Sequence, residues 1–87
     1  MVKADMADER EATAPYKRVA NALREDIKTG KYRPGAQVPS ATELAKAYSV
    51  SRNTAIRAIR LLRDEGWVTV EHGWGSFVAD DLPQADS

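Results

Sequence analysis

Apolar side chains recur through the first part of the chain at helical spacing. Between residues 16 and 29 they stand three or four positions apart with charged residues between them, which is typical of a helix with one buried face. Pro15 suits the first turn of that helix, and Gly30 suits a left-handed residue just past its end. A turn centred on Pro34 and Gly35 is expected next. The expected core positions of the helix are Tyr16, Val19, Ala20, Leu23 and Ile27.

Two further helices are expected, with about three residues between them. Ser40 and Glu43 have the spacing of a capping box, so they predict the start of a short helix that runs to about Tyr48. Ser51 is a second candidate N-cap, and the helix that it opens should end at Gly66. This spacing is typical of a helix-turn-helix. The side chains expected in the core or half-buried are Tyr32, Leu44, Ala45, Tyr48, Ala55, Ala58, Ile59 and Leu62.

After Gly66 the pattern changes from helical to extended. Residues 67–70 are mostly β-branched or aromatic and predict a strand, residues 72–75 predict a turn, and residues 76–79 predict the returning strand. Because side chains alternate across a hairpin, one face should pack on the helices, and we expect Trp67 and Trp74 to pack rather than to stack on bases. Three helices followed by a two-stranded hairpin make an α+β fold.

Length and composition limit the class of protein. The chain has 87 residues, of which 43% are apolar, so it supports one domain with a modest core. No apolar run approaches the roughly 20 residues that cross a bilayer, and the acidic start lacks the apolar stretch of a signal peptide. The absence of cysteine excludes disulfides and thiolate metal sites, and a cytoplasmic location is the simplest expectation.

The formal net charge is zero, which by itself argues against a nucleic-acid partner. The charge is unevenly distributed, however: it is −2 over residues 1–14, +5 over residues 15–78 and −3 over residues 79–87. We therefore expect a domain at 15–79 between a flexible acidic segment at 1–14 and a flexible acidic tail at 80–87. The acidic ends either improve solubility or repel nucleic acid outside the intended contact.

The helix expected at 51–65 carries a basic surface opposite its core face. Arginine can bind guanine with two hydrogen bonds, and asparagine can bind adenine in the same way. The hydroxyls of Ser51 and Thr54 and the free amides at the helix start could hold a phosphate. The alternative is that the arginines are solvated, some of them paired with Asp64 or Glu65. This surface has Asn53, Arg57 and Arg60 along its middle, Arg52 and Arg63 on one edge and Thr54 on the other.

Several blocks of the sequence agree in order and spacing with one family. They are residues 34–35 (Pro-Gly), 38–40 (Val-Pro-Ser), 50–54 (Val-Ser-Arg-Asn-Thr) and 73–78 (Gly-Trp-Gly-Ser-Phe-Val). Through these blocks the chain resembles, over residues 16–78, the winged-helix DNA-binding domain of the GntR family of bacterial transcriptional regulators.

The resemblance implies a winged helix-turn-helix that binds double-stranded DNA. It implies that Arg52, Thr54 and Arg57 contact DNA from a recognition helix in the major groove. It also implies that His72 and Gly73, at the tip of the wing, enter the adjacent minor groove. With the helix starts included, the candidate DNA-binding residues are Ser40, Thr42, Ser51, Arg52, Asn53, Thr54, Arg57, Arg60, His72 and Gly73.

The chain departs from the family's pattern at two positions and in length. Thr42 stands where the family usually has an arginine that helps to read bases, which leaves part of the usual operator preference open. Ser49 stands where the turn between the two helices usually has glycine. Family members normally carry a ligand-binding and dimerising domain after the wing, whereas this chain stops nine residues later. It would be an isolated reading head, a short member or the N-terminal part of a longer regulator, and it offers no effector pocket.

Two functions follow from these observations. The first is sequence-specific binding of double-stranded DNA by a transcriptional regulator, as a homodimer on a palindromic operator. The second is a winged-helix protein-interaction module without DNA readout, suggested by Thr42 and the acidic ends. An enzyme is not expected, because the single histidine, His72, has no nucleophile and orienting group around it. No metal ion or cofactor is expected either, because no cysteine or second histidine accompanies His72.

Overall fold

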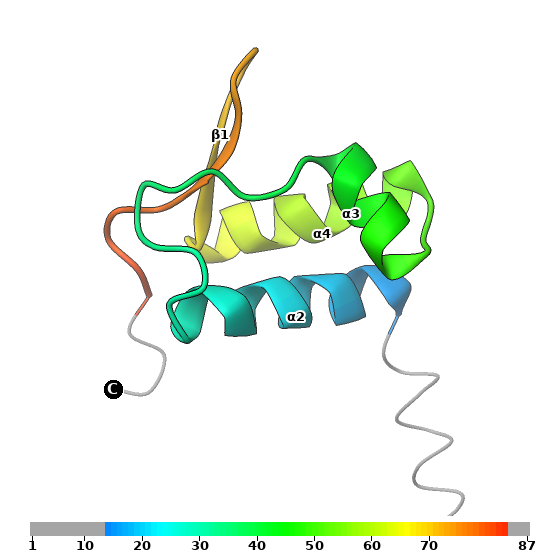
Figure 1. The fold of residues 1–87 in the computed structure, drawn as a ribbon, viewed down its shortest axis with the longest axis horizontal. Coiled ribbons are helices and arrows are strands. Elements are labelled where there is room, and N and C mark those ends of the chain that lie inside the picture. The colour runs from blue at the N-terminus through cyan, green and yellow to red at the C-terminus, as the bar shows by residue number, and fades with distance from the viewer. Residues whose placement is uncertain (1–13, 84–87) are drawn as a thin grey trace, which may run out of the picture.

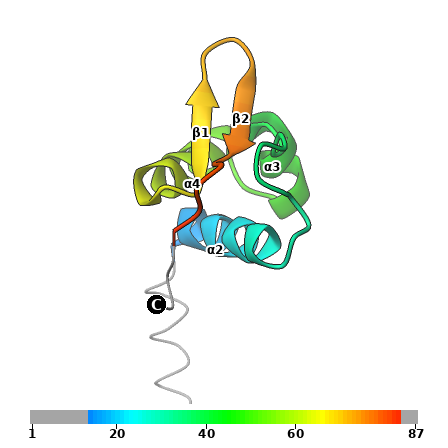
Figure 2. The same ribbon diagram turned by 90° about the vertical axis from the view of Figure 1, so that its left-hand side faces the viewer.

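The structure is a computed structural model that describes residues 14–83. Three helices, α2 (Pro15–Lys28), α3 (Ala41–Tyr48) and α4 (Arg52–Glu65), are followed by an antiparallel hairpin of β1 (Val68–Glu71) and β2 (Gly75–Val78). In Figure 1, α4 lies above α2, and the hairpin rises from the side of the molecule away from α2. Figure 2 shows the two strands side by side above the helices. The predicted α+β order of three helices and a two-stranded wing is confirmed.

Local chemistry sets the helix ends where the sequence predicts them. Ser40 and Glu43 form both bonds of the capping box: the Glu43 N–H donates to Ser40 Oγ at 3.1 Å, and the Ser40 N–H donates to Glu43 Oε1 at 2.8 Å. At α4, the hydroxyl of Ser51 accepts the N–H of Thr54 at 3.0 Å. The helix then ends at Gly66, whose φ of 91° is in the left-handed region that glycine tolerates.

The turn between α3 and α4 contains a strained residue. Ser49 has φ 56° and ψ 48°, the left-handed conformation, and it is the only non-glycine residue with positive φ in the described part of the chain. The turn therefore keeps the shape that a glycine would favour, and the serine side chain tolerates it.

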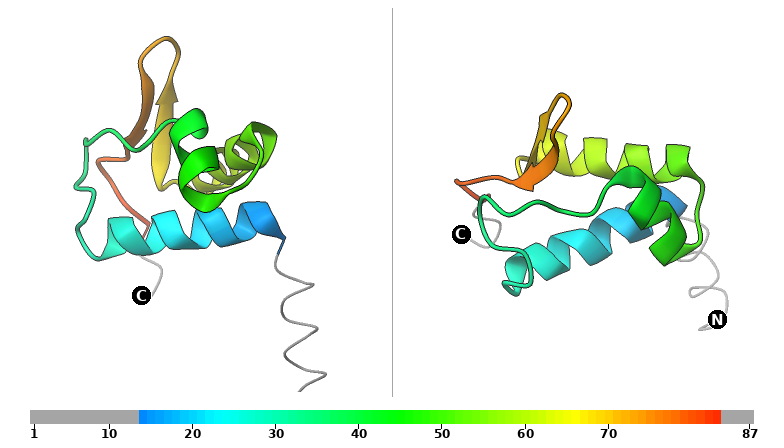
Figure 3. Two further views of the ribbon diagram at one scale, coloured as in Figure 1. Left: turned by 45° about the vertical axis from the view of Figure 1, so that its right-hand side comes forward. Right: turned by 45° about the horizontal axis from the view of Figure 1, so that its top comes forward.

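The core lies between the three helices and the base of the hairpin. α4 packs against α2, α3 and β1, and Figure 3 shows it running alongside α2 next to the hairpin. The buried apolar side chains are Val19, Ala20, Leu23, Ile27, Val38, Leu44, Ala55, Ala58, Ile59, Leu62, Trp67, Val68 and Val78. The predicted core faces of α2 and α4 are confirmed, with Tyr16 half-buried at the margin of the α2 face.

Two aromatic predictions are wrong. Tyr48, expected on the buried side of α3, is 38% exposed, because it is the last residue of the helix and the chain turns away at Ser49. Trp74, expected to pack on the helices, is 77% exposed, because it lies in the hairpin loop beyond the helices. Trp67 and Tyr32 agree with expectation, since Trp67 is 5% exposed and Tyr32 is half-buried against the core.

The wing is wider than the predicted hairpin. Residues 35–38 run antiparallel to β2 and bond to it like a third strand: the Val38 N–H donates to Ser76 O at 2.9 Å, and the Val78 N–H donates to Ala36 O at 2.8 Å. The Gly35 N–H also donates to Val78 O, at 2.9 Å. This segment joins α2 to α3, so it fixes the wing directly to the start of the helix-turn-helix.

The two ends of the described chain lie on one side of the domain. Ala14 precedes α2, and Leu82, expected in the flexible tail at 80–87, packs against the core. Figure 1 shows both ends on the α2 side, away from the tip of the hairpin. The rest of the predicted acidic segments, residues 1–13 and 84–87, lies outside the described residues. Within residues 14–83, no helix is long and apolar enough to cross a membrane.

Candidate nucleic-acid interface

The basic surface of α4 is exposed as the helical spacing predicts. Arg52, Asn53, Arg57 and Arg60 are all exposed, whereas Thr54 is half-buried. The opposite face of α4 is in the core, so these side chains point away from the interior. With 14 residues, α4 is about 21 Å long and of a diameter that the DNA major groove admits.

Three of the four arginines on α4 lack a carboxylate partner among residues 14–83. The ion pairs of this part of the chain are Arg24 with Glu65, Lys31 with Asp26, and Arg63 with Asp64. Glu65 is therefore engaged with α2, and Asp64 pairs with Arg63 at 3.1 Å. The alternative of arginines neutralised by Asp64 or Glu65 thus applies to Arg63, and the positive charge of Arg52, Arg57 and Arg60 remains available to an anion.

Two of these arginines are positioned by neighbouring helices. The guanidinium of Arg57 lies 4.1 Å from the centroid of the Tyr16 ring on α2, a cation–π contact. Arg52 Nε donates to Thr42 Oγ1 on α3 at 3.3 Å. Thr42 therefore contacts Arg52 in this structure. Sequence reasoning missed both partnerships, because they join residues of different helices.

The start of α4 has its hydroxyls already engaged. Besides accepting the Thr54 N–H, the Ser51 hydroxyl donates to Thr54 Oγ1 at 2.9 Å. The two hydroxyls that the sequence assigned to a phosphate therefore bond to each other, and they would have to exchange this bond to reach a ligand. Within the described residues, the N–H groups of Arg52 and Asn53 have no such partner, and they suit an anion better.

A shallow groove of about 340 Å³ separates α4 from the wing. It joins three predicted site residues that are far apart in the sequence, namely Ser40, Arg60 and His72. Its floor is apolar and includes Ile56 and Val70. Arg57, which leans on α2, is not part of this groove, and Gly73 lies beyond it in the wing loop, with φ 82°. The remaining lining residues are Ala41, Ile59, Arg63, Gly75 and Ser76.

The groove brings in residues that the sequence did not single out. Ile56 lies at the margin of the core face in sequence, and Val70 is one residue of a short strand, so neither carries a signal of its own. Val70 is 40% exposed, and Ile56 is half-buried. Together they place aliphatic surface between the cations of α4 and the wing. Such surface can contact deoxyribose or a thymine methyl group.

Residues 15–78 match the sequence pattern of the family described as "Bacterial regulatory proteins, gntR family". The match spans all three helices and both strands. The chain belongs to the GntR family. Its described residues form the DNA-binding winged helix of that family, as the resemblance implies.

Curated relatives of this GntR domain are named as transcriptional regulators. A histidine utilization repressor from Klebsiella aerogenes is 42% identical over 77 residues, which cover 87% of this chain and 32% of the relative. An arabinose metabolism transcriptional repressor from Halalkalibacterium halodurans is 39% identical over 69 residues, or 79% of this chain and 18% of the relative. The chain thus spans about a third or less of these relatives. They are regulators, which agrees with the expectation that the chain is no enzyme.

Solved structures agree with the fold in detail. The DNA-binding domain of AraR in complex with operator ORR3 has a TM-score of 0.73 and 34% identity, over 75% of this chain and 78% of that chain. The same domain in complex with operator ORX1 has a TM-score of 0.74 and 33% identity, over 76% and 80% of the two chains.

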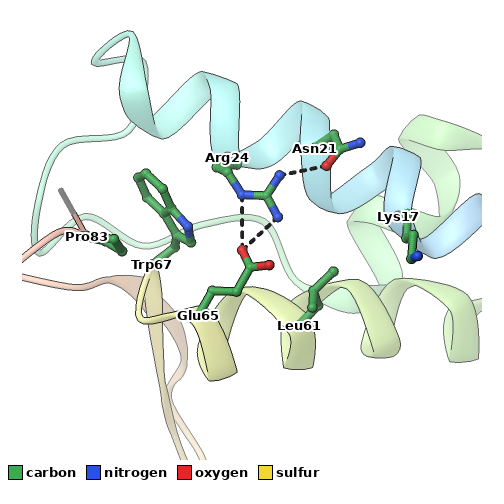
Figure 4. A pocket seen from close by; sticks show the side chains of 7 residues that line it. All are labelled: Lys17, Asn21, Arg24, Leu61, Glu65, Trp67 and Pro83. Atoms are coloured by element: carbon green, nitrogen blue, oxygen red, sulfur yellow. Dashed lines mark hydrogen bonds and ion pairs between the residues drawn. The ribbon is translucent and has the colours of Figure 1, made fainter. Parts of the chain in front are cut away.

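A second hollow of the GntR domain, of about 670 Å³, lies between α2 and α4 (Figure 4). Arg24 spans it: its Nε and Nη2 donate to Glu65 Oε1 at 3.1 and 2.7 Å, and its Nη1 donates to Asn21 Oδ1 at 2.6 Å. Trp67 and Pro83 close one end. Arg24 bonds to both Asn21 and Glu65, so these side chains link α2 to α4 across the hollow. Lys17, which lines the other end of the hollow, has no ion-pair partner among residues 14–83.

Proposed function

We propose that this domain binds double-stranded operator DNA sequence-specifically, as the reading head of a bacterial transcriptional regulator that acts in the cytoplasm. The observation that carries the proposal is the exposed face of α4, on which Arg52, Arg57 and Arg60 have no carboxylate partner among the described residues. Membership of the GntR family and the operator complexes of the similar AraR domain support it.

In this proposal α4 enters the major groove, and residues 72–75 approach the minor groove. Arg52, Asn53, Arg57 and Arg60 are the side chains that read base edges, since arginine and asparagine suit guanine and adenine. The DNA backbone between the major and minor grooves would run along the hollow between α4 and the wing, past Ser40 and His72. Thr42 would act through Arg52, to which it is bonded. Ser51, Thr54 and Gly73 would contribute phosphate or groove-edge contacts.

We further propose that two copies bind a palindromic operator as a homodimer. One short helix contacts only a few base pairs, so a single head has little contact area for affinity. The test is selection of binding sites from a random DNA library, with the oligomeric state measured in parallel. A palindromic product bound by two copies is expected. Absence of any salt-sensitive DNA binding at low salt would favour a protein-interaction module instead.

Arg57→Ala should weaken binding to the selected operator by about 1–3 kcal/mol and relax the base preference at one position of the half-site. The reason is the loss of a cationic fork that Tyr16 holds in place on the exposed side of α4. The measurement is fluorescence anisotropy with the operator and single-base variants. Lys28→Ala, which removes one charge from the far end of α2, is the control and should bind normally. Unchanged affinity and selectivity of Arg57→Ala would overturn the assignment of Arg57.

A further inference from the structure

The tip of the wing presents a large aromatic side chain to solvent. Among residues 14–83, the exposed large hydrophobic side chains are Tyr48, Val70 and Trp74, with 38%, 40% and 77% of their surface accessible. The other tryptophan, Trp67, is 5% exposed in the core. An indole so fully exposed contributes no packing to the domain, yet it would bury a large apolar area against a partner.

The backbone that carries this indole is held on both sides. The Trp74 N–H donates to Glu71 O at 2.9 Å and closes the hairpin loop. The Trp74 carbonyl accepts a bond from Gln37 Nε2, also at 2.9 Å. Gln37 belongs to the segment that pairs with β2, so the brace comes from outside the hairpin. Both polar groups of the Trp74 backbone are thus engaged, and only the side chain is free to bind.

Gly75 makes room for that brace. A Cβ atom at this position would lie 2.5 Å from Gln37 Nε2, closer than non-bonded atoms approach, and the φ of Gly75 is 120°. The backbone conformation favours glycine, and a Cβ atom would also push the Gln37 amide out of its bond to Trp74. The two bonds hold the backbone of Trp74, so binding has mainly the side-chain rotamers of the ring left to order.

The surroundings of the wing indicate the chemistry of what covers the ring. The adjoining groove is lined by Arg60, which has no carboxylate partner among residues 14–83, by His72, and by aliphatic side chains such as Ile56 and Val70. A partner that suits both features is polyanionic and offers narrow apolar walls. The DNA minor groove has this combination, because deoxyribose walls lie between two rows of phosphates.

We propose that Trp74 is an apolar wedge that enters the minor groove beside the major groove occupied by α4, and that Gln37 is the residue that positions it. The inference rests on the proposed DNA-binding function. Apolar wedges at minor-groove steps partly unstack the bases that they touch, so the DNA should be locally distorted at the flank of each half-site.

Fluorescence of the unmodified domain tests this directly. Trp67 is buried, so acrylamide quenching reports mainly on Trp74. The selected operator should shield Trp74 from acrylamide, and heparin, which supplies negative charge without base pairs, should not. A 2-aminopurine placed at the flanking minor-groove step should brighten when the domain binds, because unstacking relieves its quenching.

Variants complete the test. Trp74→Ala should bind the operator roughly tenfold more weakly and abolish the 2-aminopurine signal at saturating protein. Its salt dependence should be unchanged, since no phosphate contact is lost. Gln37→Ala should give a smaller loss of affinity and a weaker signal. Tyr48→Ala, which removes an exposed aromatic ring from α3, is the matched control and should leave binding and the signal unchanged.

The outcomes separate this inference from the function on which it rests. If the unmodified domain binds no DNA, the proposed function itself fails. If it binds the operator while Trp74 stays open to acrylamide, the function stands and the wedge is overturned. Shielding of Trp74 that rises with protein concentration without DNA would also overturn it, since a second copy would then cover the ring.

Discussion

Arg57, which we propose reads DNA bases, is held by a contact with a neighbouring helix that still leaves it able to move. A cation–π contact at an exposed site stabilises by about 0.5–1 kcal/mol. A two-bond contact between arginine and guanine contributes about 1–3 kcal/mol of discrimination. The stack on Tyr16 is therefore strong enough to limit the rotamers of Arg57 and weak enough to be given up or adjusted on DNA.

Tyr48 gives the domain an alkaline sensitivity. Although Tyr48 is 38% exposed, the partial burial that remains raises the pKa of its hydroxyl above the ordinary value of 10.0. The charges of Asp26 and of the ionised Tyr32 hydroxyl also raise this pKa, while Lys31 lowers it. The folded chain thus holds this proton more tightly than the unfolded chain. The protonated Tyr48 hydroxyl therefore contributes to the free energy of unfolding. This contribution is fully present below pH 10 and is lost as the pH rises through the folded-state pKa.

The corresponding measurement is urea unfolding between pH 8 and pH 11.5 for the unmodified domain and Tyr48→Phe. The free energy of unfolding of Tyr48→Phe should fall less steeply above about pH 10, because this variant has no phenol to ionise at position 48. Parallel curves for the two proteins would contradict the assignment.

At the scale of elements, the turn between α3 and α4 stores strain at Ser49. A left-handed conformation costs a residue with a Cβ about 1–2 kcal/mol. Glycine avoids this strain, but it also makes the unfolded chain more flexible, which offsets part of the gain in stability. Ser49→Gly should therefore raise the free energy of unfolding by about 0.5–1 kcal/mol. Ala47→Gly, inside α3, should lower it by about the same amount. Chemical denaturation of both variants checks the opposite signs, and a destabilised Ser49→Gly would contradict the reading of strain.

The helices were predictable from sequence because their signals are local. The capping pair Ser40 and Glu43 and the terminal Gly66 act within a few residues of the ends that they define. Tyr48 and Trp74 were misplaced because their exposure depends on which other elements cover them. The strand-like pairing of residues 35–38 with β2 joins segments about 40 positions apart. Neither segment has a pattern of apolar residues that would indicate this pairing.

The candidate site also has one part that could be predicted from the sequence and one part that could not. The exposed face of α4 follows from helical spacing, so Arg52, Asn53, Arg57 and Arg60 were found from sequence. The groove that joins α4 to the wing was not, because it depends on how the hairpin packs. Its apolar floor and the brace of Trp74 by Gln37 are tertiary features, and no short motif encodes them.

For the whole molecule, the uneven charge predicts how DNA binding depends on salt. The net charge is zero, but residues 15–78 carry +5, with three unpaired arginines on α4 among the described residues. If one head neutralises about five phosphates, log K should fall against log salt concentration with a slope of about −4 to −5. Titrations between 50 and 200 mM salt measure this slope. A slope near zero would mean that phosphate contacts do not drive binding.

Both ends of the described chain lie on the α2 side of the domain, away from the wing tip (Figure 1). This arrangement has a practical consequence for building chimaeras. A reporter, a dimerising module or a surface tether joined at either end would be attached away from the wing tip. The C-terminal end suits it better, because the N-terminal end lies two residues before Tyr16, which contacts Arg57. The domain is thus suited to use as a portable DNA-recognition unit, in which the attached module sets how many heads meet on one operator.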